Sequence, residues 1–387
     1  MNTKKRSSKG SKILFSVVVV LALANSLILV TGNTYLYRAF FYNFANIDDN
    51  TIFEQRKIEA GTPDEWPLSS DYNKALMPAR LLSQLEDYKS IAFLIVQNDS
   101  LRYEKYWDGY GPSSLSNSFS MAKSFVGILT GIALDEGKIS SLDQPVGDFL
   151  PEFRVGGKEK ITVRHLLTMC SGLNWVENYG NPFCVTTEAY YGKDLHQVIA
   201  SLKVQSEPGK IFTYSSGDTQ ILSFVVSKAV GMSLSDYASK KLWKQVGAVH
   251  GAEWSLDHKD GDEKGYCCVY SNARDFARMG QLFLKNGNWK GKQVVSEAYV
   301  RASIQPAPLK NQDGSANDQY GYSWWLLPHY KGHDIFYARG INGQYIFVVP
   351  DKNMVVVRLG KKRTSVKQGY HPVDVFSYID GALAMVQ

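Results

Sequence analysis

A serine and a lysine three residues apart, Ser120 and Lys123, are the residues whose types and spacing most directly suggest chemistry. Three residues make most of a helical turn, so at the start of a helix the lysine amine can lie beside the serine hydroxyl. A serine hydroxyl is a weak nucleophile until a base takes its proton. Burial in a low-dielectric pocket disfavours the charged form of a lysine, so Lys123 is a candidate for that base.

Two later segments could complete a site with this pair. Tyr214 lies in a Tyr-Ser-Ser-Gly-Asp turn directly before an apolar, helix-like segment, and a phenol near a lysine can pass a proton to a leaving group. Gly340-Ile-Asn-Gly343-Gln opens a strand-like segment, where glycines let backbone N–H groups approach a bound carbonyl as an oxyanion hole requires. Taken singly, each segment could equally be an ordinary tyrosine or a tight turn.

The composition is that of a folded protein with nearly balanced charge. The 387 residues are 44% hydrophobic and include 23 tyrosines, enough for one large domain or two closely packed ones. Basic residues among the first twelve supply most of the net charge of +6, so no basic face remains to indicate nucleic-acid binding. No Cys-x-x-Cys or His-Glu-x-x-His motif occurs, and we expect no metal and no cofactor. The oligomeric state stays open.

The N-terminal end has the pattern of a membrane anchor or a secretion signal. Residues 1–12 are basic and residues 13–31 are nearly all apolar, long enough at about 1.5 Å per residue to cross a bilayer core of roughly 30 Å. Flanking basic residues favour the cytoplasmic side, so residues 1–12 are predicted to be a cytoplasmic tail. The remainder is expected to be exported and held at the inner (cytoplasmic) membrane. A signal cleaved near Ala22-Leu-Ala is the alternative and would give a periplasmic or secreted protein.

Residues 32–75 are predicted to be a stalk and lead-in, and residues 76–387 one α+β domain. Strand patterns occur near both ends of this domain and helical patterns between them, which predicts an antiparallel β-sheet flanked by helices, an all-α insert and a cleft between the two. The predicted helices cover 80–89, 121–136, 163–169, 194–202, 219–230, 234–245, 273–286 and 373–386, and the predicted hairpins pair 91–96 with 101–107 and 343–349 with 354–359.

The four cysteines do not fix a redox compartment. Cys170 and Cys184 are close enough in sequence to be bridged across a loop, whereas the adjacent Cys267 and Cys268 are not expected to pair with each other. The loop from Asn174 to Lys193, rich in aromatic residues, is expected to border the site.

The order of Ser120-x-x-Lys123, Tyr214-Ser-Ser-Gly-Asp and Gly340-x-x-Gly343-Gln resembles the serine hydrolases of the class C β-lactamase and penicillin-binding-protein superfamily. The pattern is most similar to the esterase and 6-aminohexanoate-dimer hydrolase branch and covers residues 75–385. Three further blocks look like family framework: His165–Leu173, Ser271–Gly280 and Tyr320–Trp325.

The resemblance implies a role for each site residue. Ser120 would be the acylated nucleophile, Lys123 and Tyr214 the general base and acid, and the backbone N–H groups of Ser120 and Ile341 the oxyanion hole. Which of Lys123 and Tyr214 is the base stays open, because a coupled pair titrates as a unit. The candidate substrate-binding positions are Ser216, Gly340 and Gly343.

Two departures from the family pattern concern the substrate. Ser216 stands where β-lactamases of this class have the asparagine of Tyr-x-Asn, and Ala338-Arg339-Gly340 replaces Lys-Thr-Gly or His-x-Gly. The family's cation at that first position binds a substrate carboxylate, and strand alternation directs Arg339 to the opposite face. We therefore expect a small ester or amide as substrate.

Two other functions remain as alternatives. The same fold could act on β-lactams or peptidoglycan as a β-lactamase or D-Ala-D-Ala carboxypeptidase, or could be an inactive membrane-anchored binding protein. An α/β-hydrolase is not expected, because no Gly-x-Ser-x-Gly elbow occurs.

Overall fold

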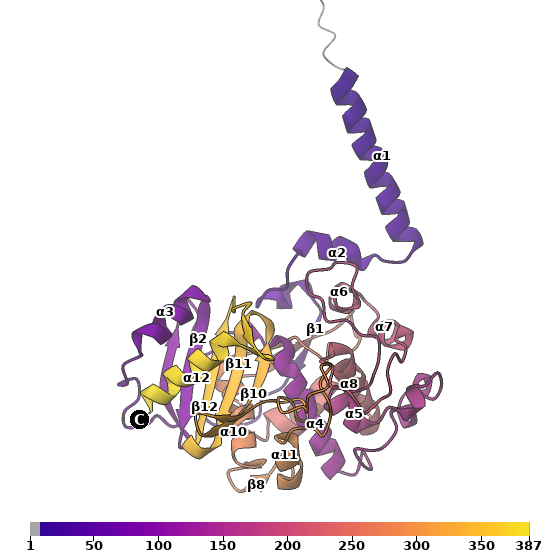
Figure 1. Ribbon diagram of the computed structural model, residues 1–387. Coiled ribbons are helices and arrows are strands. Elements are labelled where there is room, and N and C mark those ends of the chain that lie inside the picture. The colour runs from indigo at the N-terminus through magenta and orange to yellow at the C-terminus, as the bar shows by residue number, and fades with distance from the viewer. Residues whose placement is uncertain (1–7, 387) are drawn as a thin grey trace, which may run out of the picture.

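A computed structural model describes residues 8–386, and its centre is a six-stranded antiparallel sheet in the order β3-β2-β12-β11-β10-β9 (Figure 1). The chain begins the sheet with one hairpin and returns to complete it with its last strands. The strands are β2 (Ser90–Gln97), β3 (Ser100–Tyr106), β9 (Trp325–Tyr330), β10 (His333–Gly340), β11 (Gln344–Val349) and β12 (Met354–Gly360). Both predicted hairpins are confirmed, and β9 with β10 extends the second one.

Alternating side chains of the sheet belong to two hydrophobic clusters. On β2, Phe93 and Ile95 pack into one cluster, while Leu94 and Val96 pack into the other. The first face is covered by α3 (Ala79–Asp87) and α12 (Val373–Met385), and the second by α10 (Ala273–Leu284) (Figure 1). The prediction of a sheet flanked by helices on both faces is therefore confirmed.

The helical region lies beside the sheet and is organised around α4. Residues Ala122 to Ala133 of α4 are buried all round, as their uninterrupted apolar pattern predicts. Gly131 is required there, because a Cβ would collide with the Tyr299 ring. The helices of this region are α4 (Ala122–Asp135), α5 (Val163–Leu167), α6 (Val185–Tyr191), α7 (Leu195–Ser201), α8 (Ser216–Val230), α9 (Leu234–Ala238) and α11 (Glu297–Ser303).

A second, smaller sheet has the order β1-β5-β6-β4 and connects the N-terminal lead-in to the rest of the folded body. Gln55 of β1 pairs with Ser255 of β5, so the chain joins the folded body upstream of the predicted boundary at residue 76. The strands are β1 (Gln55–Ile58), β4 (Ser116–Asn117), β5 (Ala252–Ser255) and β6 (Val269–Ser271); two small hairpins are β7 (Asn288–Trp289) with β8 (Lys292–Gln293) and β13 (Lys367–Gln368) with β14 (His371–Pro372).

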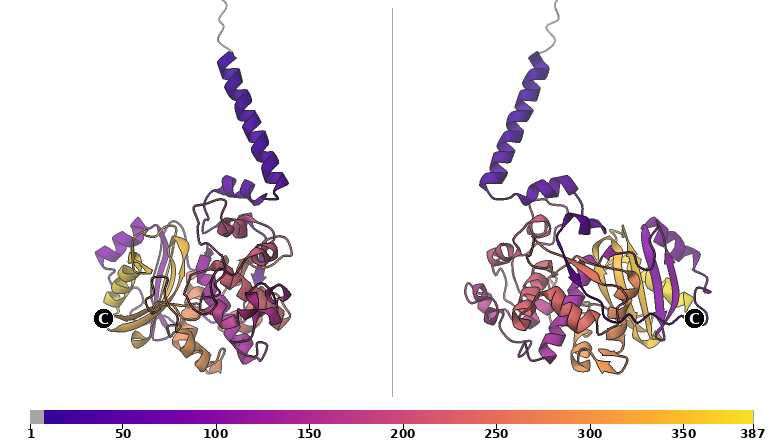
Figure 2. Two further views of the ribbon diagram at one scale, coloured as in Figure 1. Left: turned by 45° about the vertical axis from the view of Figure 1, so that its right-hand side comes forward. Right: turned by 180° about the vertical axis from the view of Figure 1, so that it is seen from behind.

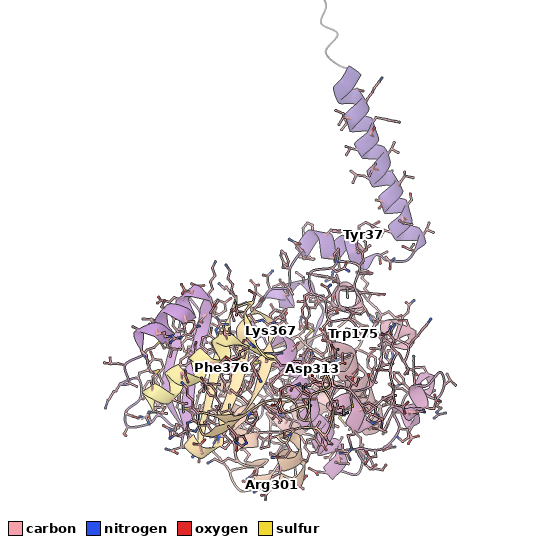
Figure 3. All side chains as sticks on the ribbon, in the orientation of Figure 1. Tyr37, Trp175, Arg301, Asp313, Lys367 and Phe376 are labelled. Carbon is pink, nitrogen blue, oxygen red and sulfur yellow. A yellow bond between two sulfur atoms is a disulfide. The ribbon has the colours of Figure 1, made fainter. Side chains whose placement is uncertain are left out.

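Two helices precede this sheet. The first, α1 (Ser8–Val30), extends away from the body, and within the described residues its stretch Gly10–Val30 is the one helix long and apolar enough to cross a membrane (Figure 2). The second, α2 (Tyr35–Tyr42), packs on α6, and its Tyr37 lies near the junction with α1, where the hydroxyl donates to Asn25 Oδ1 at 2.5 Å (Figures 1 and 3). Residues 1–7 of the predicted basic tail lie outside the described residues.

The cysteine prediction needs a correction. Cys267 and Cys268 form a disulfide with each other, whereas Cys170 and Cys184 are buried free thiols. Cys268 adopts a φ of 71°, and the sharp turn at this peptide brings the two side chains together. Sequence adjacency alone argues against such a bridge, because the required backbone conformation is uncommon for a residue with a Cβ.

Candidate active site

Ser120 lies where the small sheet meets α4. The chain leaves β4, makes a 3₁₀ turn over Phe119–Met121 and continues directly into α4. Phe119 has a φ of 43°, and its N–H donates to the Asn117 side-chain oxygen at 2.8 Å. A left-handed conformation in a phenylalanine costs about 1–3 kcal/mol, so the surrounding contacts must hold it. This turn leaves Ser120 half-buried at the cavity wall.

Lys123 is buried directly behind Ser120. Its side chain is 1% exposed, and Nζ lies 3.0 Å from Ser120 Oγ. The same nitrogen donates to Ser216 Oγ at 3.0 Å and to the Tyr266 carbonyl oxygen at 2.9 Å. The predicted proximity of the hydroxyl and the amine is therefore present, and three oxygens fix the amine in place.

Tyr214 reaches the same place from the turn before α8. Its ring centroid lies 5.1 Å from Lys123 Nζ. The ring packs against Trp325 and Tyr320, with centroid separations of 5.3 and 6.1 Å. Aromatic neighbours from the sheet side of the molecule thus hold the phenol beside the lysine, and three segments distant in sequence meet at one point.

Ser216 begins α8, and a carboxylate that sequence reasoning missed lies beside it. The Ser216 N–H donates to Glu177 Oε1, and Trp175 Nε1 donates to the same oxygen at 2.9 Å. Glu177 belongs to the loop predicted to border the site. That prediction rests on the aromatic residues of the loop and does not include this carboxylate.

The predicted oxyanion loop closes on Ser120 from the sheet. Ile341 lines the same cavity as Ser120. A Cβ at Gly340 would collide with the Ser118 carbonyl oxygen, so only glycine lets the end of β10 approach the segment before Ser120. Gly343 has a φ of 84°, and a Cβ there would collide with the Arg358 guanidinium. Both glycines serve backbone packing, and substrate contact by either one stays a prediction.

Arg358 is a further residue that the sequence did not single out. Its side chain is fully buried within the sheet, yet it pairs with backbone oxygens rather than with a carboxylate. It donates to the carbonyls of Asn342, Gly343, Lys362 and Tyr88 and to Ser90 Oγ, at distances of 3.0, 2.7, 3.1, 2.6 and 3.0 Å. One guanidinium thus holds both the loop that carries Ile341 and the loop that follows β12.

Ser120 opens into a cavity of about 720 Å³. Its walls come from α2 and the loop after it, from the 174–193 loop with α6, and from the chain after β12. Lining residues include Phe40, Phe44, Tyr179, Tyr190, Tyr191, Ser216, Tyr266, Cys267, Ile341, Lys361, Lys362 and Arg363. The prediction that the aromatic loop borders the site is confirmed.

Two buried ionisable groups near the site have displaced pKa values. Burial raises the pKa of Asp218, in the first turn of α8, to about 7, although Ser171 Oγ donates to it at 2.6 Å. Burial lowers the pKa of Lys264 to about 7, and its single hydrogen bond goes to the Ala189 carbonyl at 3.2 Å. Lys264 is two residues from Tyr266, whose carbonyl holds Lys123. In residues 8–386 no group of three His, Cys, Asp or Glu side chains is placed to hold a metal.

An antiparallel sheet packed against a helical region, with a Ser-x-x-Lys pair buried at their junction, defines the serine hydrolases of the β-lactamase type. The chain belongs to the Beta-lactamase family, whose sequence profile matches residues 79–371.

The chain is similar to several named hydrolases in sequence or in structure. The chain is 26% identical over 319 residues to 6-aminohexanoate-dimer hydrolase from Paenarthrobacter ureafaciens, covering 78% of this chain and 80% of the relative. A Bacillus anthracis structure provisionally named 6-aminohexanoate-dimer hydrolase superposes with a TM-score of 0.73 at 22% identity, covering 88% of this chain and 92% of the other. A family VIII carboxylesterase superposes with a TM-score of 0.63 at 17% identity, covering 82% of this chain and 98% of the carboxylesterase.

Proposed function

We propose that this hydrolase cleaves small esters or amides through an acyl-enzyme on Ser120, with Lys123 and Tyr214 as the general base and acid. The observation that carries the proposal is the placement of Lys123 Nζ, 3.0 Å from Ser120 Oγ and 5.1 Å from the Tyr214 ring centroid. A hydroxyl, an amine and a phenol gathered around one buried nitrogen can move a proton in either direction without a cofactor.

The contacts of Lys123 support its use as a base. Ser216 Oγ and the Tyr266 carbonyl can each accept one N–H of a neutral amine, which leaves the nitrogen lone pair directed at the Ser120 hydroxyl. In this role Ser216 positions the lysine, in addition to any contact with substrate that its place on the cavity wall allows.

The reaction then follows in two steps. Ser120 Oγ gives its proton to the Lys123–Tyr214 pair and bonds to the substrate carbonyl carbon, while the N–H groups of Ser120 and Ile341 receive the developing oxyanion. The bond to the alkoxide or amine breaks, and the same pair returns the proton to this leaving group. In the second step, water gives a proton to the pair and attacks the acyl carbon. The C–O bond to Ser120 breaks, and Ser120 regains its proton.

The β10 residues favour esters or amides over β-lactams and D-Ala-D-Ala peptides. Ala338, at the position where the family pattern has a cation, is buried. Arg339 is engaged elsewhere, since its guanidinium stacks 3.5 Å from the Trp325 ring centroid and donates to the Tyr370 carbonyl at 2.8 Å. The names of two relatives, a dimer hydrolase and a carboxylesterase, support the same substrate class, whereas an Escherichia coli relative provisionally named D-alanyl-D-alanine carboxypeptidase supports the alternative.

We also propose that α1 anchors the protein in the cytoplasmic membrane with the catalytic domain outside the cytoplasm. No residue of the apolar window within Gly10–Val30 is buried, as expected for a lipid-facing helix, and only its C-terminal end contacts the body, through Ile28 and Asn25. The disulfide between Cys267 and Cys268 is compatible with an oxidising compartment. Cleavage of α1 as a signal would give the same exported domain without the anchor.

The test is labelling of the full chain in detergent with a fluorophosphonate probe, together with turnover of p-nitrophenyl esters. We expect labelling and turnover in the wild type, neither in Ser120→Ala, and at least about a 10²-fold loss in Lys123→Ala. Lys138→Ala is the matched control, because Lys138 is exposed just beyond the far end of α4. Unchanged turnover in Ser120→Ala or Lys123→Ala would refute the mechanism.

A further inference from the structure

The cavity beside Ser120 has two walls of opposite chemical character. One wall comes from the N-terminal segment and presents Ala39, Phe40, Asn43 and Phe44. The other comes from the chain directly after β12 and presents Lys361, Lys362 and Arg363. The two segments are more than three hundred residues apart in sequence, and Asn342 Nδ2 connects their sides by donating to the Ala45 carbonyl at 3.2 Å.

The wall after β12 is cationic and only partly balanced by counter-charge, since Arg363 is close enough to the buried Asp374 to oppose the rise that burial causes in the pKa of that carboxyl. Lys361 pairs with Asp108 at 3.0 Å, while the ion pairs found within residues 8–386 include none for Lys362 or Arg363. None of the described cavity-lining residues is acidic. Glu177, behind Ser216, is not part of the lining and accepts hydrogen bonds from Ser216 and Trp175. A concave surface with one sign of charge attracts and retains an anion.

This cationic wall is held in a fixed position. Arg358 Nη1 donates to the carbonyl of Lys362 and also to the carbonyls of the Ile341 loop, at Asn342 and Gly343. An anion bound by Lys362 and Arg363 would therefore lie at a fixed position relative to the Ile341 loop, and so relative to Ser120.

The opposite wall is apolar and continues the N-terminal helix. Phe40 and Phe44 are 59% and 65% exposed, and Phe40 packs edge-on against Phe183 at a centroid distance of 6.3 Å. α2 begins five residues after α1 ends, so an α1 that spans the bilayer places this aromatic wall at the membrane surface. Aromatic side chains are favoured at that depth.

From these two walls we infer that the substrate is an anionic amphiphile taken from the membrane surface, an ester or amide whose apolar chain lies against α2 and whose anionic group binds Lys362 and Arg363. The inference rests on the proposed function, because it assumes that Ser120 is the nucleophile of this cavity. It assigns to Lys362 and Arg363 a role in substrate selection and leaves the acyl-transfer chemistry unchanged.

The first experiment compares two soluble esters that differ by one charge. p-Nitrophenyl valerate ends in a methyl group, and mono-p-nitrophenyl glutarate has a carboxylate in its place. With the full chain in detergent we expect kcat/KM for the glutarate to be higher by about tenfold, the contribution of one charge-assisted hydrogen bond. Equal values, or a preference for the valerate, would overturn the inference.

Charge reversal then tests the assigned residues. In Lys362→Glu/Arg363→Glu we expect the ratio of kcat/KM for the glutarate to kcat/KM for the valerate to fall below one, both values being measured on the same variant. Arg301→Glu is the matched control, because Arg301 is an exposed cation at the end of the molecule away from α2 (Figure 3). If the reversed variant fails to fold, Lys362→Gln/Arg363→Gln removes the charges alone and should abolish the preference. A preference retained in a folded variant, or lost equally in Arg301→Glu, would refute the assignment.

The second experiment tests the membrane source. The full chain is reconstituted in phosphatidylcholine vesicles that carry mono-p-nitrophenyl hexadecanedioate, a long-chain anionic ester that inserts in the bilayer. Faster hydrolysis of this ester than of dissolved glutarate supports an amphiphilic substrate. Hydrolysis of the dissolved ester only would overturn the membrane source.

Different results would refute the proposed function and the inferred anionic substrate. Hydrolysis of both soluble esters that persists in Ser120→Ala would remove the proposed function. Hydrolysis that depends on Ser120 but does not distinguish the two charges would remove only the anionic substrate.

Discussion

Replacement of Lys264, the fully buried lysine near Tyr266, should stabilise the protein at neutral and acidic pH and change its response to pH. Lys264 is 0% exposed, and its ammonium has one hydrogen-bond acceptor and a cation–π contact to Phe53 at 4.8 Å. Burial lowers its pKa from 10.5 to about 7, because the folded protein solvates the charge poorly. At about 1.4 kcal/mol for each pKa unit, this difference corresponds to ~5 kcal/mol of folding free energy lost at acidic pH.

The direction in which stability changes with pH follows from the lowered pKa of Lys264. Between about pH 7 and 10.5 the unfolded chain holds a proton that the folded chain has released, so stability rises with pH across this window. Below about pH 7 both states are protonated and the full penalty is present. In Lys264→Met the penalty is absent at every pH, while the Ala189 carbonyl loses its donor at a cost of about 1–3 kcal/mol.

We therefore expect Lys264→Met to raise the free energy of unfolding by ~2–4 kcal/mol at about pH 6, and to leave it unchanged or lower it by up to about 2 kcal/mol near pH 10, where little of the penalty remains. Urea unfolding of the full chain in detergent, repeated across this pH range, measures both quantities. Lys160→Met, which replaces a 61% exposed lysine, is the control and should change stability by no more than about 0.5 kcal/mol. If the free energy of unfolding changes with pH in the same way in Lys264→Met and in the wild type, the claim that Lys264 is buried at this energetic cost is refuted.

Three further predictions concern the site. Tyr214→Phe should lower ester turnover by about 10²–10⁴-fold while fluorophosphonate labelling of Ser120 persists, because fluoride leaves without a proton; loss of labelling would point to a structural role. Reduction of the disulfide between Cys267 and Cys268 should lower kcat by about tenfold, because Tyr266 next to it fixes Lys123; the double serine variant should show the low rate and no response to dithiothreitol. Arg358→Lys should lower the free energy of unfolding by about 3 kcal/mol and kcat/KM with it, measured by urea unfolding and ester turnover, because lysine cannot satisfy all the carbonyls that the guanidinium holds.

The parts of the site that the sequence predicts are those built from local geometry. The contact of Ser120 with Lys123 follows from helical spacing, and the burial of α4 follows from its uninterrupted apolar pattern. Tyr214 is different, since no spacing rule connects it to Lys123. Its assignment depends on the order of motifs in a family, and the packing of its ring on Trp325 supplies the physical link.

The parts that the sequence does not predict depend on tertiary packing. The cationic residues after β12 become part of the cavity only because the last strands pair beside the loop that carries Ile341 and Arg358 connects the two loops. The sequence does not predict that Glu177 lies at the site, because its contact with the Ser216 N–H joins two segments that are far apart in the chain. The disulfide depends on one backbone angle at Cys268, a local conformation that composition does not reveal.

The position of α2 has a practical consequence for anyone who prepares this enzyme. The helix that follows α1 also supplies one side of the cavity beside Ser120, through Phe40 and the loop that contains Phe44. A soluble fragment trimmed to residues 79–371, the part that matches the family, would keep Ser120 and lose that side. Its activity toward short, water-soluble esters would then misrepresent the substrates that the intact protein selects.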